Sequence, residues 1–299
     1  MRLPSYHFSL MKSFYKINIK ILGLFMILHF AQACTKKESD AFVYRSFKKA
    51  NVKPIIYRTS DSQASLRWIE AKLSDQNESV VIFVHGAPGS ADAFYNYLKD
   101  TTLLKDHILV SVDRLGYGAS ERGNAEPSIV AQSDAVKEVL NHYLSTDKRI
   151  CLVGHSYGGP VIAKLAMDFG KKISGLLFLA PAIDPENEKV FWITKFGKTP
   201  PTSWITPGPF KVATQEKIYH VQALQEIESS WNKIDTRVTY MHGTKDMIVP
   251  FENMAFAKRK LAHINVKWIS IEGENHFIPW KQYDAVVREI QLLTQTSNN

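Results

Sequence analysis

The feature that most constrains the fold of this 299-residue chain is a series of short apolar runs separated by helical patterns. Hydrophobicity within each run is continuous rather than alternating, which predicts strands covered on both faces and therefore a mostly parallel sheet. The runs occupy residues 80–84, 108–112, 150–153, 176–179, 238–241 and 266–271. Strands that alternate with helices in this way predict an open α/β sheet with right-handed crossovers.

The segments between and before these runs complete the expected layout. Four of them carry apolar residues at helical spacing and predict helices over 128–143, 156–169, 251–261 and 284–293. Two further strand-like stretches, 55–58 and 65–71, precede the first run. The second stretch alternates apolar and polar residues, so we expect it to belong to a half-exposed edge pair.

The composition indicates a folded globular protein and argues against a nucleic-acid partner. A hydrophobic content of 45% with 22% charged residues is typical of a folded globular chain. The net charge of +8 could indicate a nucleic-acid partner, but four of the positive charges and no acids precede residue 34, which leaves +4 for the rest of the chain. No dense basic run occurs there, so nucleic acid is not expected as a partner.

Residues 1–33 have the pattern of an export signal, with a basic start, a short apolar core and small residues at the exit. Cys34 directly follows Ala33, which resembles the lipobox of bacterial lipoproteins and implies lipidation of Cys34 and an anchor in the bacterial envelope. Ordinary cleavage after Ala33, which would release a periplasmic or secreted protein, is the alternative. Met11 is a second candidate start. We expect residues 34–51 to be a polar tether.

The region 181–235 interrupts the alternation of strands and helices. It is rich in proline and holds half of the chain's tryptophans: Trp192, Trp204 and Trp231. Long irregular segments inside a compact domain are usually functional, so we predict a small cap inserted into a core formed by 52–180 and 236–299. Cys151, inside an apolar run, is expected to be a core residue without a disulfide partner.

The candidate nucleophile is Ser156, in the sequence Gly154-His155-Ser156-Tyr157-Gly158 between a predicted strand and a predicted helix. Glycines permit a turn tight enough to raise the serine hydroxyl clear of the sheet. A surface-exposed hydroxyl of this kind needs a base, an orienting acid and donors for the developing oxyanion.

His276 is the best candidate base, because it lies in a loop just past the last predicted strand. Asp246, five residues beyond the strand that ends at Met241, is the best candidate acid. Asp184, which follows the preceding strand, is a weaker candidate because Asp184-Pro185 is typical of a turn.

The glycine-rich turn 85–90 follows the first run and is expected to fold against the nucleophile turn. We predict that the backbone N–H groups of Ala87 and Tyr157 bind the oxyanion, the latter at the positive end of a helix. Asp113, after the second run, is expected to bind loop amides rather than to take part in chemistry.

Together, the His85-Gly86-x-Pro88-Gly89 turn, the stretch from Asp113 to Ser120, the Ser156 pentapeptide, Asp246 and His276 resemble the α/β-hydrolase family over about residues 52–295. The resemblance implies an α/β-hydrolase fold, with an eight-stranded, mostly parallel sheet flanked by helices and a cap after the sixth strand. Serine at 156 argues against the epoxide hydrolases and haloalkane dehalogenases of this family, which use aspartate. Tyr157 stands where proline-releasing aminopeptidases usually have tryptophan.

The expected activity is that of a carboxylesterase-type serine hydrolase acting on small or medium apolar esters, with Ser156, Asp246 and His276 catalytic and no cofactor or metal. Amide, thioester or carbon–carbon bond hydrolysis on the same three residues is the first alternative, and a non-catalytic binding protein is the second. We expect a monomer.

Overall fold

Eight strands form one sheet in the part of the chain that the computed structural model describes, which is residues 39–59, 65–188 and 208–295. The strands are β1 (Ile55–Arg58), β2 (Arg67–Ala71), β3 (Ser79–Val84), β4 (His107–Val112), β5 (Arg149–His155), β6 (Gly175–Leu179), β7 (Arg237–Gly243) and β8 (Val266–Ile271). Their order across the sheet is β1-β2-β4-β3-β5-β6-β7-β8. β2 is antiparallel to both of its neighbours, and every other pair is parallel. The predicted eight-stranded, mostly parallel sheet is therefore confirmed.

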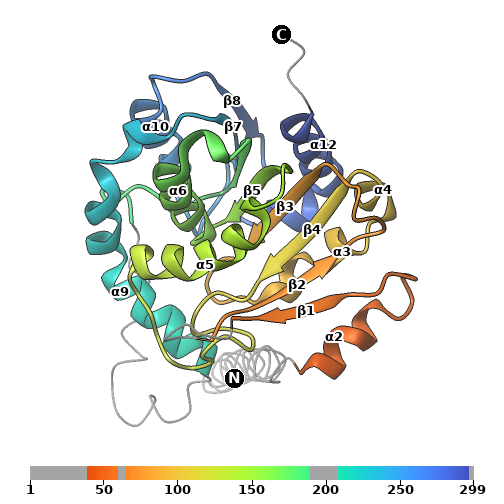
Figure 1. The fold of residues 1–299 in the computed structure, drawn as a ribbon. Helices are drawn as coiled ribbons and strands as arrows, with labels where there is room; N and C mark the ends of the chain where they lie inside the picture. Colours follow the sequence, from red (N-terminus) through yellow and green to blue (C-terminus); the bar gives the residue numbers. More distant parts are fainter. Residues whose placement is uncertain (1–38, 60–64, 189–207, 296–299) are drawn as a thin grey trace, which may run out of the picture. The chain divides into compact units, whose positions relative to one another are not determined.

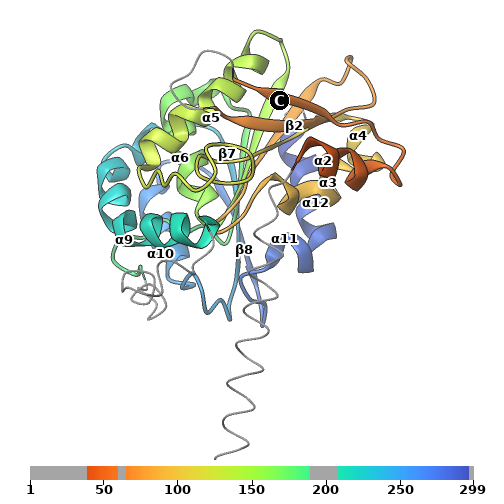
Figure 2. The same cartoon turned by 90° about the horizontal axis from the view of Figure 1, so that it is seen from below.

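Helices cover both faces of this sheet (Figures 1 and 2). The α-helices are α2 (Asp40–Phe47), α3 (Tyr95–Leu98), α4 (Thr101–Leu104), α5 (Ile129–Leu144), α6 (Gly158–Phe169), α9 (Gly208–Glu228), α10 (Asn253–Lys260), α11 (Ile278–Lys281) and α12 (Tyr283–Thr294). Short 3₁₀ helices are η1 (Ala91–Phe94), η2 (Gly170–Lys172) and η3 (Trp231–Lys233). All four helices predicted from periodicity are present, as α5, α6, α10 and α12.

Two apolar clusters, one on each face, hold the helices to the sheet. Along β3, Val80 and Ile82 enter the cluster shared with α5, α6, α9 and α10, whereas Val81 and Phe83 enter the cluster shared with α2, α3, α4 and α12. Successive side chains of a strand point to opposite faces, so a strand between two layers of helices must be apolar at every position. This explains the continuous runs in the sequence.

The start of α5 shows how a helix boundary is encoded locally. The Ser128 side chain accepts a hydrogen bond from the Ala131 amide at 3.2 Å and so caps the first turn. Val136, Leu140 and Tyr143 then recur at helical spacing and are buried against the sheet.

β2 differs from its prediction as a half-exposed strand, because all five of its residues are buried. Its two charged side chains are buried with partners. Arg67 forms an ion pair with Asp113 at 2.6 Å, and Glu70 accepts a hydrogen bond from the Tyr143 hydroxyl at 2.6 Å. The alternating pattern thus arises from satisfied polar groups and not from exposure to solvent.

The predicted tether over 34–51 is also incorrect for part of its length, since residues 40–47 form α2. The Ser39 side chain accepts from the Phe42 amide and caps the helix. Val43 and Phe47, four residues apart, are buried against the core, and Asp40 forms an ion pair with Arg58 on β1 at 2.6 Å. Two apolar positions in a polar stretch are enough to attach this helix to the sheet.

Several predictions concern residues outside the described part of the chain: the signal over 1–33, Cys34, Trp192 and Trp204. Within the predicted cap, the structure describes α9 and η3. Trp231 of η3 is buried in the core, with its ring 5.8 Å from that of Phe256. None of the helices that the structure describes is both long enough and apolar enough to cross a membrane.

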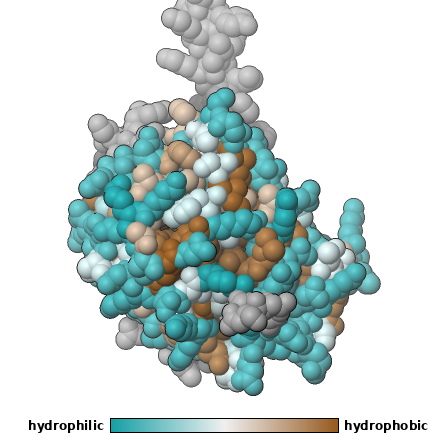
Figure 3. Space-filling model, turned by 90° about the horizontal axis from the view of Figure 1, so that it is seen from above, coloured by the Kyte–Doolittle hydropathy of each residue, from teal (hydrophilic) through white to brown (hydrophobic). Residues whose placement is uncertain are grey.

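Figure 3 shows one face, on which apolar residues gather in a band that hydrophilic residues surround.

Cys151, predicted as a core residue, is fully buried as a free thiol, and burial raises its pKa to about 12. That thiol is therefore protonated and unreactive at neutral pH.

Candidate active site

Ser156 occupies a strained turn between β5 and α6. Its φ is +54°, a backbone conformation that residues with a side chain rarely adopt, and its amide donates to the Leu179 carbonyl oxygen at 3.1 Å. A Cβ at Gly154 would lie 2.6 Å from the Gly158 carbonyl oxygen, and one at Gly158 would collide with the carbonyl oxygen of Val84. Both glycines are therefore required by close approach of the backbone, as the sequence pattern predicts.

Asp246 and His276 are brought together directly. The Asp246 Oδ2 atom lies 2.7 Å from Nδ1 of His276, and both side chains are buried. The other carboxylate oxygen accepts hydrogen bonds from the amides of Ile248 and Val249, each at 2.8 Å. The loop after β7 therefore fixes the carboxylate, and the carboxylate fixes the imidazole through Nδ1, which leaves Nε2 without a partner among the described residues.

His242 contributes to the same arrangement. Its Nε2 lies 3.2 Å from Asp246 Oδ2 and 3.2 Å from the Val249 carbonyl oxygen, so the ring braces the acid loop. Burial alone would raise the pKa of Asp246, but hydrogen bonds from His242 and His276 outweigh that effect and hold the pKa well below its usual range. The acid is accordingly ionised at neutral pH.

The loop that carries His276 is attached to the nucleophile turn through His155. The His155 Nε2 atom lies 3.1 Å from the His276 carbonyl oxygen, and the two ring centroids are 4.7 Å apart. Burial, reinforced by the neighbouring His276, lowers the pKa of His155 to about 3, so its neutral ring donates from Nε2. Among the described residues, the Ser156 hydroxyl itself makes no hydrogen bond to His276.

Asp184, the weaker candidate acid, serves its own turn. Its carboxylate accepts from the Glu186 amide at 2.9 Å and from the Asn187 side chain at 2.8 Å. Asp113 is likewise structural, because its oxygens accept from the amides of Ala91 and Ala119 at 2.7 and 2.9 Å in addition to pairing with Arg67. Both residues take the local roles that the sequence predicts.

The turn after β3 packs against the nucleophile turn. A Cβ at Gly86 would lie 2.8 Å from the Cβ of Ser156, so only glycine permits this contact. The amides of Ala87 and Tyr157 donate to no acceptor among the described residues. Two unpaired donors from two turns in contact are what an oxyanion site requires, and Tyr157 also stands at the N-terminus of the twelve-residue helix α6.

Sequence reasoning missed Glu216, a buried residue of α9 that forms an ion pair with buried Arg114 at 2.6 Å. Arg114 lies within the recognised motif after β4, but nothing in the sequence around Glu216 distinguishes it from a solvent-facing glutamate. Burial raises the pKa of the Glu216 carboxyl, while Arg114 and the Tyr117 hydroxyl oppose that shift.

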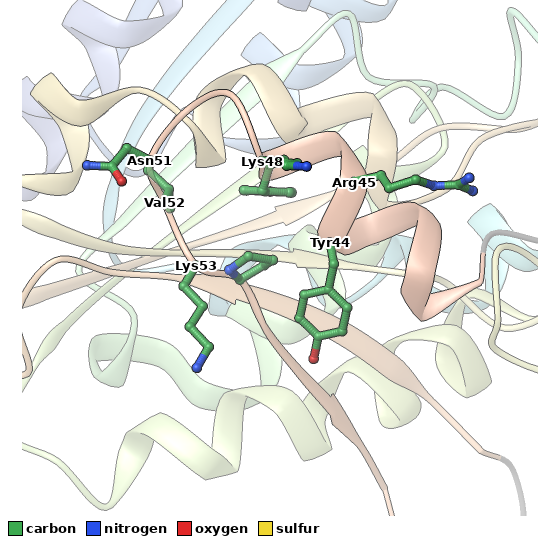
Figure 4. Close-up of a pocket in the computed structure, with 8 residues that line it drawn as sticks. Tyr44, Arg45, Lys48, Asn51, Val52 and Lys53 are labelled. Carbon is green, nitrogen blue, oxygen red and sulfur yellow. The ribbon is translucent and has the colours of Figure 1, made fainter.

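No described group of His, Cys, Asp or Glu side chains is arranged to hold a metal ion. A hollow of about 400 Å³ lies between α2 and the chain that leads into β1 (Figure 4). Tyr44, Arg45, Lys48 and Lys53 are among the residues that line it, and none of the predicted site residues does. The hollow is therefore separate from the candidate active site.

In a comparison with known families, the model of the alpha/beta hydrolase family matches residues 81–289. The fold and the site geometry agree with this match. The chain belongs to the alpha/beta hydrolase family. The match begins inside β3 and ends inside α12, so it includes the turns that carry Ser156, Asp246 and His276. This α/β-hydrolase is thus an enzyme of the hydrolytic kind.

Individual relatives match parts of the hydrolase. Mesoderm-specific transcript protein of Mus musculus is 31% identical over 99 residues, which cover 33% of this chain and 29% of that protein. Methylesterase 8 of Arabidopsis thaliana is 29% identical over 156 residues, which cover 49% of this chain and 57% of that protein. The matched part is thus less than two thirds of either relative.

A solved structure extends the likeness to most of the fold. The haloalkane dehalogenase DatA of Agrobacterium tumefaciens has a TM-score of 0.64 at 16% sequence identity, over 81% of this chain and 96% of that one. At this identity the similarity concerns the fold alone.

Proposed function

We propose that this α/β-hydrolase is a serine hydrolase of the carboxylesterase type, which cleaves small or medium apolar esters through an acyl-serine intermediate. The observation that carries the proposal is the 2.7 Å contact between Asp246 and His276, beside the strained turn that presents Ser156. An acid–imidazole pair oriented in this way is the arrangement that activates a serine hydroxyl.

In the proposed reaction, the Ser156 oxygen attacks the ester carbonyl carbon while its proton passes to Nε2 of His276. The Ala87 and Tyr157 amides bind the resulting oxyanion. Collapse of the tetrahedral intermediate breaks the bond to the alcohol, which leaves with the proton from His276. Water, deprotonated by the same imidazole, then attacks the acyl-serine and releases the carboxylic acid.

Apolar side chains next to the acid and the base support an apolar substrate. Met247 and Ile248 directly follow Asp246 and are 75% and 40% exposed, and Phe277 and Trp280 follow His276 and are 47% and 42% exposed. Large exposed apolar side chains that gather beside a site commonly mark a binding surface for apolar groups. The methylesterase among the relatives is named for ester chemistry of the same kind.

The direct test is replacement of Ser156 by alanine. If the three residues act as a unit, kcat for an activated ester falls by about six orders of magnitude, with the protein still folded. Turnover of p-nitrophenyl esters measures the loss, and a fluorophosphonate probe should label the wild-type protein but not Ser156→Ala. Substantial residual turnover in the variant would refute the assignment of the nucleophile.

The substrate class is tested by comparing esters of graded acyl length with aminoacyl amides and thioesters. The proposal predicts the highest kcat/KM for apolar esters. Preferential cleavage of an amide, a thioester or a carbon–carbon bond would instead assign the same triad to another hydrolase reaction. A wild-type protein that no fluorophosphonate labels would be a binding protein on this fold.

We also propose export of the chain and lipidation of Cys34, on the strength of the signal pattern over residues 1–33. Expression of the full chain in a bacterium should place the wild-type protein in the membrane fraction, with an N-terminal mass that includes diacylglycerol on Cys34. Diacylglycerol on one cysteine supplies two acyl chains, which give stable anchoring where a single chain binds only marginally. The variant Cys34→Ser should appear in the soluble fraction, and an unmodified wild-type thiol would overturn the proposal.

A further inference from the structure

A fully buried ion pair lies behind the nucleophile turn and joins α9 to the loop after β4. The guanidinium of Arg114 meets the Glu216 carboxylate with Nη1–Oε1 at 2.6 Å and Nη2–Oε2 at 3.3 Å. The Tyr117 hydroxyl donates to Glu216 at 2.6 Å, and the Gln132 side chain donates to it at 3.4 Å. Removing two charges from water is costly, so a pair in this position calls for a role beyond stability.

The remaining guanidinium donors point at the turn that carries the proposed oxyanion donor. Nε of Arg114 donates to the His85 carbonyl oxygen at 2.9 Å, and Nη2 donates to the Gly86 carbonyl oxygen at 3.1 Å. The Gly86 carbonyl and the Ala87 N–H belong to the same peptide unit. A positive charge bound at the carbonyl oxygen draws electron density from the N–H and makes it a stronger hydrogen-bond donor.

No second positive charge stands on this turn. The His85 Nε2 atom accepts a hydrogen bond from the Arg114 amide at 3.1 Å, so the ring proton is on Nδ1, which contacts the Gly86 carbonyl oxygen at 2.7 Å. Burial and the neighbouring Arg114 hold the pKa of His85 well below its usual range, so that ring is neutral. The guanidinium alone supplies the charge.

The same guanidinium also contacts the second proposed donor residue. It lies over the ring of Tyr157 at 4.5 Å and over that of Tyr117 at 4.8 Å. Arg114 therefore touches both turns that supply the oxyanion donors, and Glu216 holds it there from α9.

We infer that Arg114, fixed by Glu216, is a positioning residue that orients and polarises the Gly86–Ala87 peptide as an oxyanion donor. The inference rests on the proposed function, because it assigns a role in that reaction. The Arg114–Glu216 ion pair thereby links α9, which lies within the predicted cap, to the strength of the hydrogen bond that the oxyanion site can donate. The pair makes no direct contact with the candidate triad side chains, and its effect would pass through the backbone.

The test compares Arg114→Lys with Arg67→Lys. Each change keeps a buried positive charge next to a carboxylate, Glu216 or Asp113, but only Arg114 contacts the turn after β3. Lysine cannot donate to two carbonyl oxygens while it holds the carboxylate. Loss of a whole oxyanion donor costs about 10²–10³-fold in kcat, so weakening one should lower kcat of Arg114→Lys about tenfold, with KM nearly unchanged. Arg67→Lys should keep the wild-type kcat per folded molecule.

A second measurement separates positioning from folding. A boronic acid whose oxygen occupies the oxyanion site should bind Arg114→Lys about tenfold more weakly than wild type, in parallel with kcat. The double variant Arg114→Met/Glu216→Leu removes both charges together, folds without an unpaired ion, and should show the same loss. Wild-type kcat and boronate affinity in either folded Arg114 variant would overturn the inference. A wild-type protein that fluorophosphonate does not label would instead overturn the proposed function, and the inference with it.

Discussion

At the scale of single residues, Asp246 shows how an acid is kept ionised in a buried site. One of its oxygens meets two imidazoles, from His242 and His276, and the other accepts two backbone amides. Four donors compensate for the loss of water, so the charged form is favoured despite burial. The same contacts orient His276, which ties the electrostatics of the acid to the geometry of the base.

Replacing Asp246 with asparagine should therefore affect both activity and the pH dependence of stability. An amide at this position no longer holds the His276 tautomer, so kcat for an activated ester should fall about 10⁴-fold. The depressed pKa of Asp246 gives the wild-type fold a contribution to stability that is complete above the unfolded-state pKa of about 3.9. That contribution declines as pH falls below this value. The difference in free energy of unfolding between wild type and Asp246→Asn, measured by urea unfolding, should therefore be smaller at about pH 3 than at about pH 5.

Asp184→Asn is the matched control, because Asp184 holds only its own turn. Its kcat should equal that of wild type. An Asp184→Asn variant as inactive as Asp246→Asn, or a stability difference for Asp246→Asn that does not change with pH, would contradict the roles given to these two carboxylates.

At the scale of elements, α2 is part of the hydrolase core. Its exposed face carries Phe42 and Tyr44, whereas Val43 and Phe47 face the sheet, and the Phe47 ring packs on Tyr95 at 5.1 Å. A short helix with two buried side chains depends on that packing, because eight residues form no stable helix alone.

Phe47→Ala should lower the free energy of unfolding by about 3–5 kcal/mol, since it leaves a cavity in a packed cluster. Phe42→Ala, on the same helix but 37% exposed, should change it by less than about 1 kcal/mol. Urea unfolding followed by tryptophan fluorescence would measure both. A loss for Phe47→Ala as small as the one expected for Phe42→Ala would mean that α2 contributes nothing to the core.

The elements that could be predicted are those whose signal lies within a few neighbouring residues. β3 to β7 follow from continuous apolar runs, because each lies between two layers of helices. β8 differs from this prediction, because it is the edge strand and its Lys267 and Ser270 are exposed. For β2 the local pattern predicts the wrong exposure, because its charged residues are compensated by distant partners, Asp113 and Tyr143, that no local pattern reveals. α2 gives no periodic signal in the sequence, because its buried face consists of only two residues.

For the whole molecule, the arrangement of strands explains why the candidate site residues could be named. Four parallel strands, β3, β5, β7 and β8, are each followed by a loop that carries site residues: Gly86 and Ala87, then Ser156, Asp246 and His276. The carboxyl ends of parallel strands lie at one edge of a sheet, so loop position alone predicts that these residues converge. Glu216 reaches the same edge from a helix face, where only the packed structure reveals it.

The narrow gap between Gly86 and Ser156 also limits how this enzyme could be altered. A methyl group at position 86 would meet the Cβ of Ser156 at 2.8 Å and a backbone oxygen at 3.4 Å, so the turn could accept it only by moving away from the serine. In a saturation library screened for new substrates, active clones should retain glycine at this codon. Diversity should accumulate instead at positions such as Met247 and Phe277, whose side chains face solvent.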